Sequence, residues 1–293
     1  MDAVPARIDT DVKLRDGRTL GYAEYGDPAG TPVVLFNGAA SRLFYPLDDA
    51  IVRAANARII TVDRPGIGRS DFKPQRTLLD WPDDIGELTD ALGVHRFAVA
   101  GASAGGPYAA ACAYRLPERV TALGLISSLA PFDIPEATQG MARAYRMIPL
   151  LTRYVPWLLT LSQSVMMRNP EAVWKQFYRR LPEADKAILR AQSTVDFKAM
   201  LVQDIPETYR SGAYGVVWDT IVLTRPWGFR AADITVPTYL WQGEQDVNVP
   251  PAMGAYLART IPQCHAWFIP NEGHLMYLKH AQEIVSILVA EGK

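Results

Sequence analysis

The run Gly101-Ala102-Ser103-Ala104-Gly105-Gly106 places a serine between glycines with the spacing G-x-S-x-G. A short apolar stretch, 96–100, precedes it, and a stretch of small residues typical of a helix, 107–116, follows it. A serine at the tip of a sharp strand-to-helix turn has a strained backbone, so its neighbours must be small. The start of the following helix offers unpaired N–H groups, which suit a developing oxyanion. The sequence therefore predicts that Ser103 is a nucleophile.

A serine hydroxyl is a weak nucleophile near neutral pH and needs a general base. Of the four histidines, His95 and His265 begin predicted strands, and His280 lies in the predicted closing helix, where we expect it to be solvated. His274 follows the last predicted strand. In open α/β sheets the active-site residues lie at the carboxyl ends of the strands, and Ser103 lies at that edge. We therefore expect His274 to be the base.

The base needs a carboxylate that orients it. Asp246 follows the predicted strand 237–241 and a turn at Gly243, and it precedes a predicted helix. Glu244 directly follows the turn glycine, a position that fits simple exposure to solvent. Asp246 is therefore the preferred acid. Asp133, just past the end of another predicted strand, is a competing candidate and stays open at this point.

An oxyanion requires two backbone donors. The N–H group of Ala104, the residue after the nucleophile, is the first. The second is expected from the loop after the strand 32–36, where Gly38 permits a close backbone approach and Ala39 supplies the N–H group. Asn37, Gly38 and Ala102 are expected to border the substrate.

The elements that must position these residues alternate between strand and helix. An N-terminal hairpin is predicted at 12–14 and 19–25, and further strands follow at 32–36, 58–62, 97–100, 120–126, 237–241 and 266–269. Helices are predicted at 45–56, 78–92, 107–116, 251–259 and 275–291. Such alternation predicts an α/β fold with right-handed crossovers and a mostly parallel sheet.

The alternation stops between residues 131 and 230, where prolines divide a helical pattern into short pieces. We interpret 131–230 as a helical cap (lid) inserted into a core formed by 1–130 and 231–293. The insertion holds five of the eight methionines and four of the seven tryptophans. Most of these side chains fill the interior of the cap, and a minority are expected to line an apolar pocket.

Composition narrows the range of partners. The 293 residues carry a net charge of −1, which gives no electrostatic reason to expect a nucleic acid or an anionic membrane. Cys112 and Cys264 are too far apart to indicate a disulfide framework or a metal site. The first residues do not resemble a secretory signal, and the richest apolar stretch, 148–161, contains Arg153 and two prolines, so no membrane span is predicted. We expect a cytoplasmic protein, a monomer or homodimer, with a small-molecule substrate.

The motifs together resemble the α/β-hydrolase superfamily, specifically its lidded serine hydrolases. The resemblance covers about 15–130 and 233–290, and rests on Asn37-Gly38, 63–70, 101–106, 243–246 and Gly273-His274. It implies a mostly parallel eight-stranded sheet flanked by helices, with a helical cap insertion. The order Ser103, Asp246, His274 is that of this family. The family usually has His-Gly where this chain has Asn37-Gly38, which implies an altered geometry of the oxyanion loop.

The resemblance implies hydrolysis of a carboxylic ester, or a related acyl bond, of a small apolar or aromatic substrate through an acyl-enzyme. No cofactor or metal is implied. Lactone opening, carbon–carbon bond hydrolysis and prolyl aminopeptidase activity use the same triad and stay open, although prolyl iminopeptidases carry a Gly-Gly-Pro-Gly loop that is absent here. Dehalogenases and epoxide hydrolases of this fold use an aspartate nucleophile. A non-catalytic ligand receptor on the same fold is the alternative from another class.

Overall fold

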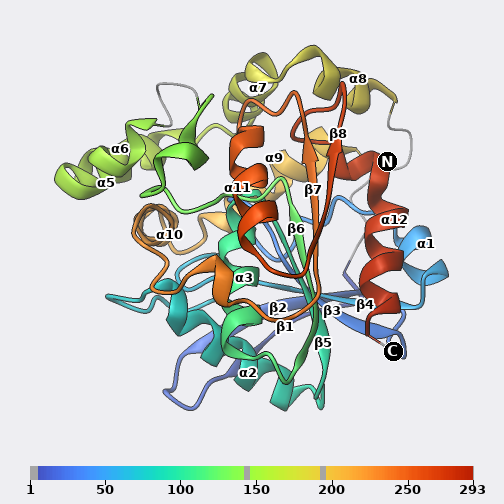
Figure 1. Cartoon of the computed structure of the whole chain (residues 1–293). Coiled ribbons are helices and arrows are strands. Elements are labelled where there is room, and N and C mark those ends of the chain that lie inside the picture. Colours follow the sequence, from blue (N-terminus) through green and yellow to red (C-terminus); the bar gives the residue numbers. More distant parts are fainter. Residues whose placement is uncertain (1–5, 142–145, 192–195, 293) are drawn as a thin grey trace.

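In the computed structural model, which describes residues 6–141, 146–191 and 196–292, the chain forms an eight-stranded sheet with helices on both faces (Figure 1). The strand order is β1-β2-β4-β3-β5-β6-β7-β8. β2 runs antiparallel to both of its neighbours, β1 and β4, and all the other pairs are parallel. The strands are β1 (Ile8–Lys13), β2 (Thr19–Gly26), β3 (Thr31–Phe36), β4 (Ala57–Val62), β5 (Phe97–Ala102), β6 (Val120–Ile126), β7 (Thr238–Gly243) and β8 (Cys264–Ile269). The predicted α/β class and mostly parallel sheet are confirmed.

The burial of each strand follows from its place in the sheet. All seven residues of β6 are buried, as are all but the last residue of β5, because helices cover both faces of the central strands. Their sequences are accordingly continuous apolar runs. The edge strand β1 alternates between half-buried and exposed residues instead. The carboxyl ends of β3, β5, β7 and β8 meet at one edge, where the predicted site residues lie.

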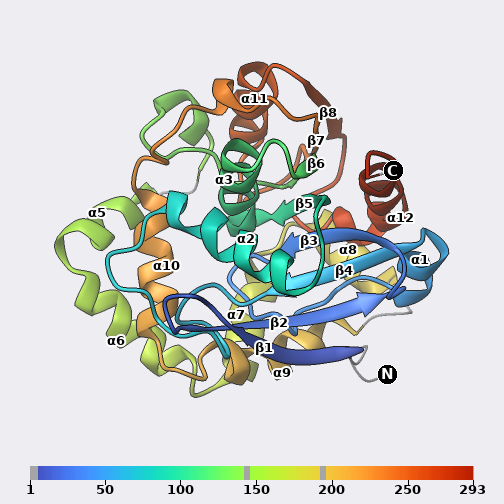
Figure 2. The same ribbon diagram turned by 90° about the horizontal axis from the view of Figure 1, so that it is seen from below.

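Helices divide the interior into two cores. The helices α2 (Trp81–Ala91), α3 (Gly106–Arg115) and α11 (Pro251–Thr260) cover one face, and α1 (Asp49–Ala54) and α12 (Tyr277–Ala290) cover the other (Figure 2). The helix expected over 45–56 is shorter, because Asp48 accepts a hydrogen bond from the N–H of Ala50 and caps α1 there. The pattern at 78–92 likewise begins as a 3-10 turn, Leu78–Asp80, before α2.

Helices fill the segment between β6 and β7. They are α5 (Ile148–Tyr154), α6 (Pro156–Met166), α7 (Pro170–Arg180), α8 (Glu183–Ala191), α9 (Phe197–Thr208) and α10 (Tyr214–Thr224). Residues 131–230 are called the inserted segment below. α5 and α6 project from the body of the molecule (Figure 1). The division into a core and a functional cap remains a prediction. Within the described ranges, no helix combines the length and apolarity that crossing a bilayer requires.

Candidate active site

Ser103 lies at the carboxyl end of β5, in the short 3-10 turn Ser103–Gly105 that leads into α3. Its backbone has a φ of +55°, a conformation that a non-glycine residue rarely adopts. The neighbouring glycines allow this turn. A Cβ atom on Gly101 would lie 2.4 Å from the carbonyl oxygen of Gly105, and a Cβ atom on Gly105 would lie 2.0 Å from that of Phe36. Only a hydrogen atom fits at both positions. The tight turn that strains the backbone of Ser103 is therefore also the reason for the two glycines of the G-x-S-x-G spacing.

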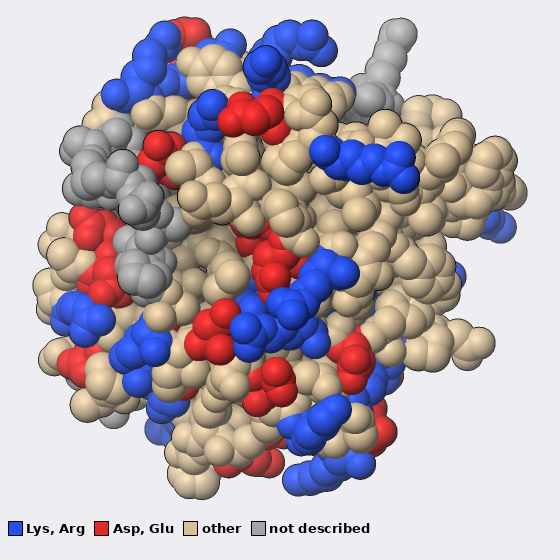
Figure 3. Space-filling view, turned by 180° about the vertical axis from the view of Figure 1, so that it is seen from behind, with Lys and Arg blue, Asp and Glu red and all other residues tan. Residues whose placement is uncertain are grey.

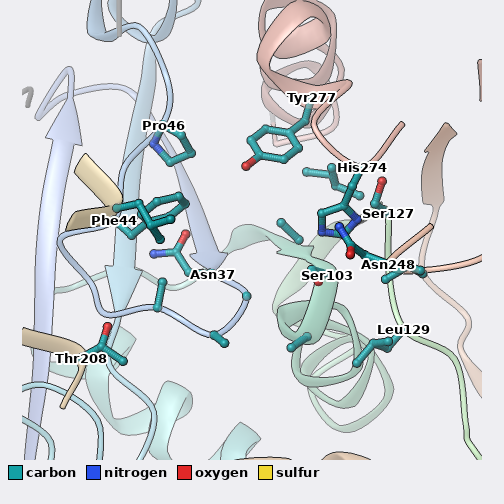
Figure 4. A pocket seen from close by; sticks show the side chains of 18 of the residues that line it. Asn37, Phe44, Pro46, Ser103, Ser127, Leu129, Thr208, Asn248, His274 and Tyr277 are labelled. Carbon is teal, nitrogen blue, oxygen red and sulfur yellow. The ribbon is translucent and has the colours of Figure 1, made fainter. Parts of the chain in front are cut away.

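His274 and Asp246 come together at the same edge of the sheet. Nδ1 of His274 lies 2.8 Å from Oδ2 of Asp246, although 27 residues separate them in sequence. The imidazole is 12% exposed and Asp246 is fully buried. This contact leaves Nε2 of His274 as the nitrogen available to the cavity, where Figure 4 shows His274 and Ser103 on the same side. The two side chains have the arrangement of a general base and its orienting acid.

Asp246 is itself held in place by backbone donors. Its Oδ1 atom accepts hydrogen bonds from the N–H groups of Asn248 at 2.8 Å and Val249 at 2.9 Å. Oδ1 of the carboxylate therefore binds the loop, while Oδ2 contacts His274 and accepts a longer hydrogen bond from Gln242, at 3.4 Å. Asp133 is exposed to solvent. Of the two acids that the sequence left open, Asp246 is the one in contact with the histidine.

The pKa of His274 reflects two opposing influences. Burial lowers it, but the charges of Asp246 and Asp185, together with the hydrogen bond that the imidazole donates to Asp246, outweigh burial, so the pKa is raised above its ordinary value of 6.5. Asp185 is a buried residue of α8. Its carboxylate accepts the backbone N–H groups of His274 at 3.0 Å and Leu275 at 2.8 Å. The inserted segment thus holds the loop that carries the histidine.

The loop after β3 lies directly against the turn that carries Ser103. A Cβ atom on Gly38 would lie 3.5 Å from Cβ of Ser103. The side-chain amide of Asn37 donates to the carbonyl oxygen of Ser41 at 2.8 Å, so this asparagine braces its own loop. Ala39 and Ala104 both border the cavity that contains Ser103. Their part in an oxyanion hole stays a prediction.

The side chain of Arg64 also holds the loop after β3. Its guanidinium donates to the carbonyl oxygens of Asn37, at 2.7 Å, and Gly38. With their carbonyl oxygens held by Arg64, these peptides are fixed in orientation beside Ser103. Arg64, in the run 63–70, therefore has a structural role.

A buried ion network connects Arg64 to the inserted segment. Asp219 on α10 accepts hydrogen bonds from Arg64 at 2.9 Å, Arg76 at 2.8 Å and the hydroxyl of Tyr108 at 2.6 Å. Burial alone would raise the pKa of Asp219, but the two guanidinium groups and the hydroxyl hold it below its ordinary value. The carboxylate is therefore ionised and joins the two guanidinium groups and the tyrosine hydroxyl.

A third carboxylate of the inserted segment contacts the loop after β3. Asp204 on α9 accepts the backbone N–H of Ser41 at 3.1 Å and a hydrogen bond from its hydroxyl. Asp185, Asp204 and Asp219 thus each hold a different part of the candidate site. Sequence reasoning missed all three, because they lie outside any motif and their partners are far away in the chain.

These loops enclose a cavity of about 510 Å³. Ser103 and His274 lie on one side, and Asn37, Phe44 and Pro46 lie on the other (Figure 4). Gly38 and Ala102 also line it, as the sequence predicts for residues that border the substrate. Apolar side chains of the inserted segment, of α12 and of the sheet provide much of the remaining wall. The site thus joins a candidate nucleophile and base to an apolar chamber.

Of two expectations about side chains, the first holds, because a minority of the methionines and tryptophans of the inserted segment line the cavity, and the second, that His280 is solvated, needs correction. Met141 and Met166 line the cavity, but none of the tryptophans of the inserted segment does so among the described residues. Trp157 is exposed to solvent, and Trp174 lies against Phe177 and Tyr178. His280 is only partly exposed, because Nε2 of its ring lies 2.9 Å from a carboxylate oxygen of Glu272.

In the part of the chain that the structure describes, no group of three or more His, Cys, Asp or Glu residues could hold a metal ion.

Comparison with known proteins shows which family this architecture resembles. A family model described as "alpha/beta hydrolase fold" matches residues 31–281. Over 276 residues the chain is 26% identical to the dihydrolipoyllysine-residue acetyltransferase component of the acetoin cleaving system of Pseudomonas putida. That match covers 94% of this chain and 66% of the P. putida protein. The chain therefore spans slightly less than two thirds of that relative.

A second relative matches over a shorter stretch. Proline iminopeptidase of Xylella fastidiosa is 34% identical over 120 residues, which are 38% of this chain and 36% of that protein. Among solved structures, the enol-lactonase from Burkholderia xenovorans LB400 has a TM-score of 0.69 at 19% identity, covering 96% of this chain and 98% of that chain. At this identity the structural likeness concerns the fold.

Proposed function

Because the chain belongs to the alpha/beta hydrolase fold family, we propose that it is a serine hydrolase that cleaves the carboxylic ester of a small apolar substrate. The observation that carries this proposal is the 2.8 Å contact between His274 and Asp246 beside Ser103, whose φ of +55° is that of a strained turn. Ester cleavage needs a nucleophile, a base and an oriented acid, and these three residues supply them.

In the proposed acylation step, Oγ of Ser103 attacks the ester carbonyl carbon while Nε2 of His274 accepts its proton. The carbonyl oxygen becomes an oxyanion, which the N–H groups of Ala39 and Ala104 stabilise. The C–O bond to the alcohol then breaks, and His274 returns the proton to the departing oxygen. Asp246 stays ionised throughout and stabilises the imidazolium.

Deacylation repeats these steps with water. His274 accepts a proton from a water molecule, whose oxygen attacks the acyl carbon, and the bond to Oγ of Ser103 breaks as the proton returns to it. The products are a carboxylic acid and an alcohol. None of these steps requires a metal or an organic cofactor.

The walls of the cavity support an apolar acyl group. One part of the cavity lies among side chains of the inserted segment, including Leu201 and Ile205. Another part lies between the sheet and α12, where Ala281, Ile284, Val285 and Leu288 face Val33, Ala100 and Ile126. Residues spaced three and four apart lie on one face of a helix, so this part follows α12 for about two turns.

Lactone opening uses the same steps, since a lactone is a cyclic ester, and an enol-lactonase shares this fold. Cleavage of an N-terminal residue from a peptide would further require a carboxylate that binds the free amine. Asp204 and Asp219 are the acidic residues among the described lining of the cavity. Both already accept several hydrogen bonds, from Ser41 and Thr208 in one case and from two arginines in the other. This favours an ester over a peptide.

A fluorophosphonate probe tests the proposed nucleophile. We expect the folded wild-type protein to be labelled at Ser103, at a pH where His274 is neutral, and to hydrolyse short p-nitrophenyl esters. The variant Ser103→Ala should lose both properties and keep its melting temperature. Wild-type turnover by Ser103→Ala would refute the assignment, and absent labelling of the wild type would favour a non-catalytic ligand receptor.

A further inference from the structure

The two consecutive helices α5 and α6, called the hairpin α5–α6 below, expose an unusual amount of apolar surface. Ten large apolar side chains are strongly exposed among the described residues, and seven of them belong to this hairpin or precede it directly. Figure 3, a view from behind, shows the projection at the right as a mostly uncharged surface. We call this surface the apolar patch; it consists of Met147, Leu150, Tyr154, Trp157, Leu158, Leu161 and Val165. Contiguous exposed apolar surfaces in stable proteins mark interaction sites.

The orientation of α6 makes the patch a continuous face. Trp157, Leu161 and Val165 are spaced four residues apart, so they share one side of the helix, and they are 65%, 57% and 60% exposed. No residue of α6 is buried. The opposite side of the helix carries Gln163, which accepts a hydrogen bond from the hydroxyl of Tyr209. The helix therefore leaves one row of large apolar side chains facing solvent, whereas a helix at the surface of a core usually exposes polar groups there.

In the stretch of sequence that contains the apolar patch, every charged residue is basic. Residues 137–170 contain four arginines and no acidic residue. Arg146, Arg153 and Arg168 are exposed. An apolar face with tyrosine and tryptophan, bordered by arginines, complements the surface of a bilayer that contains anionic lipids.

A second copy of the chain fits this patch less well. In a two-fold symmetric dimer the patch would pack against itself and bring the arginines of both copies together. Repulsion between these like charges opposes that contact, because the hairpin has no acidic residue to offset it. An anionic lipid surface covers the same apolar side chains and neutralises the arginines.

From these observations we propose that the hairpin α5–α6 binds to the surface of an anionic phospholipid bilayer. The apolar patch enters the boundary between headgroups and acyl chains, and the arginines contact lipid phosphates. With 7 and 11 residues, the two helices are too short to span the bilayer and lie in its plane. The inference is independent of the proposed ester cleavage, because lipid binding is measured without any substrate.

The hairpin also borders the candidate site. Ile148 on α5 and Gln163 and Met166 on α6 line the cavity that contains Ser103. The surface that contacts lipid and the wall of the cavity are therefore opposite sides of the same two helices. The proposed lipid contact would therefore place the part of the cavity wall that these helices form next to the bilayer.

Co-sedimentation with vesicles tests the proposal. We expect the wild-type chain to sediment with vesicles of phosphatidylglycerol and phosphatidylcholine, and to bind vesicles of phosphatidylcholine alone much more weakly. The double variant Trp157→Ser/Leu161→Ser should reduce the partition coefficient by roughly tenfold or more, because it removes apolar area from the membrane boundary. Arg153→Glu/Arg168→Glu should reduce it similarly and abolish its dependence on salt.

Matched controls make each result specific. Trp267→Ser changes a tryptophan that is also exposed, but on the edge strand β8. Arg96→Glu/Arg115→Glu changes the net charge equally, at exposed positions away from the hairpin. Both controls should bind vesicles like the wild type, and circular dichroism should show that every variant is folded. Equal binding to neutral and anionic vesicles, or unchanged binding by the patch variants, would overturn the proposal. A wild-type dimer that ignores vesicles and is dissociated by Trp157→Ser/Leu161→Ser would assign the patch to a second copy.

Discussion

The backbone N–H of His274 donates to the carboxylate of Asp185, although 88 residues lie between them in the sequence. Asp185 belongs to a helix of the inserted segment, whereas His274 lies in the loop after the last strand. The same carboxylate also accepts the N–H of Leu275. One buried side chain therefore sets the position of the loop and adds negative charge near the imidazole.

Replacing Asp185 with asparagine should change the pH dependence of activity. The pKa of His274 is raised partly by the charge of Asp185, and a general base acts only when it is neutral. Activity therefore falls as the pH drops through this raised pKa. Asp185→Asn removes the charge and one of two acceptor oxygens. We expect kcat/KM to fall by roughly tenfold and its acidic limb to move to lower pH.

The pH profile distinguishes a local effect from a general one. Asp133→Asn removes an exposed carboxylate and should leave the acidic limb unchanged. If Asp185→Asn lowered activity at every pH by the same factor, Asp185 would hold the loop without influencing the titration of His274.

The two candidate acids should differ greatly in their effect on turnover. Asp246→Asn replaces the oxygen that orients His274, so the imidazole loses both its alignment and the stabilisation of its charged form. We expect kcat for a p-nitrophenyl ester to fall by roughly a thousandfold. Asp133→Asn should leave kcat close to the wild-type value. The reverse ranking would transfer the role of the acid to Asp133.

Protonation of Asp219 at acidic pH should lower the free energy of unfolding. Its pKa is depressed in the folded chain, so its stabilisation is present above the unfolded value of 3.8 and is lost as the pH falls through the folded value. Asp219→Asn leaves Arg64 and Arg76 without their charge partner. We expect a loss of about 3–5 kcal/mol in unfolding free energy at neutral pH, and a smaller further loss on acidification, measured by urea denaturation.

An exposed ion pair serves as the control for Asp219. Asp233→Asn breaks the contact with Arg230, which is mostly exposed, and should leave the denaturation curve unchanged. Parallel pH dependences of stability for the wild type and Asp219→Asn would show that the buried network does not contribute as argued.

The part of the cavity along α12 should determine the tolerated acyl length. Ala281 lines it, and Ala281→Phe would fill space between the helix and the sheet. We expect kcat/KM for p-nitrophenyl esters of long acyl chains to fall, while acetate hydrolysis is retained. Ser286→Phe adds the same ring on the exposed side of α12 and should change neither. An equal loss for short and long esters would indicate a general disturbance of packing.

Much of the site could be predicted because its signals are local. The small residues around Ser103 identify a strained turn, and the positions of Asp246 and His274 after predicted strands place them at one edge of a parallel sheet. The helix at 45–56 was predicted too long, because the periodicity of apolar residues does not reveal where Asp48 caps the chain.

The contributions of the inserted segment could not be predicted in the same way. Asp185, Asp204 and Asp219 carry no motif, and each partner lies on a distant element, so only the folded chain identifies them. The net charge of −1 likewise averages over the whole chain and conceals the residues 137–170, where every charged side chain is an arginine. Long-range contacts and local charge asymmetry both depend on where the helices pack.

The three buried carboxylates restrict how this enzyme fold can be re-engineered. A chimera that received the corresponding helices from a relative would acquire a new chamber but lose the acceptors of His274, Ser41 and Arg64. The recipient would then contain two buried guanidinium groups, those of Arg64 and Arg76, without a counter-ion, and two loops without anchors. Substrate range in this scaffold is therefore not exchangeable as a module, and redesign must either transplant the partner residues together or keep these three aspartates and alter the side chains between them.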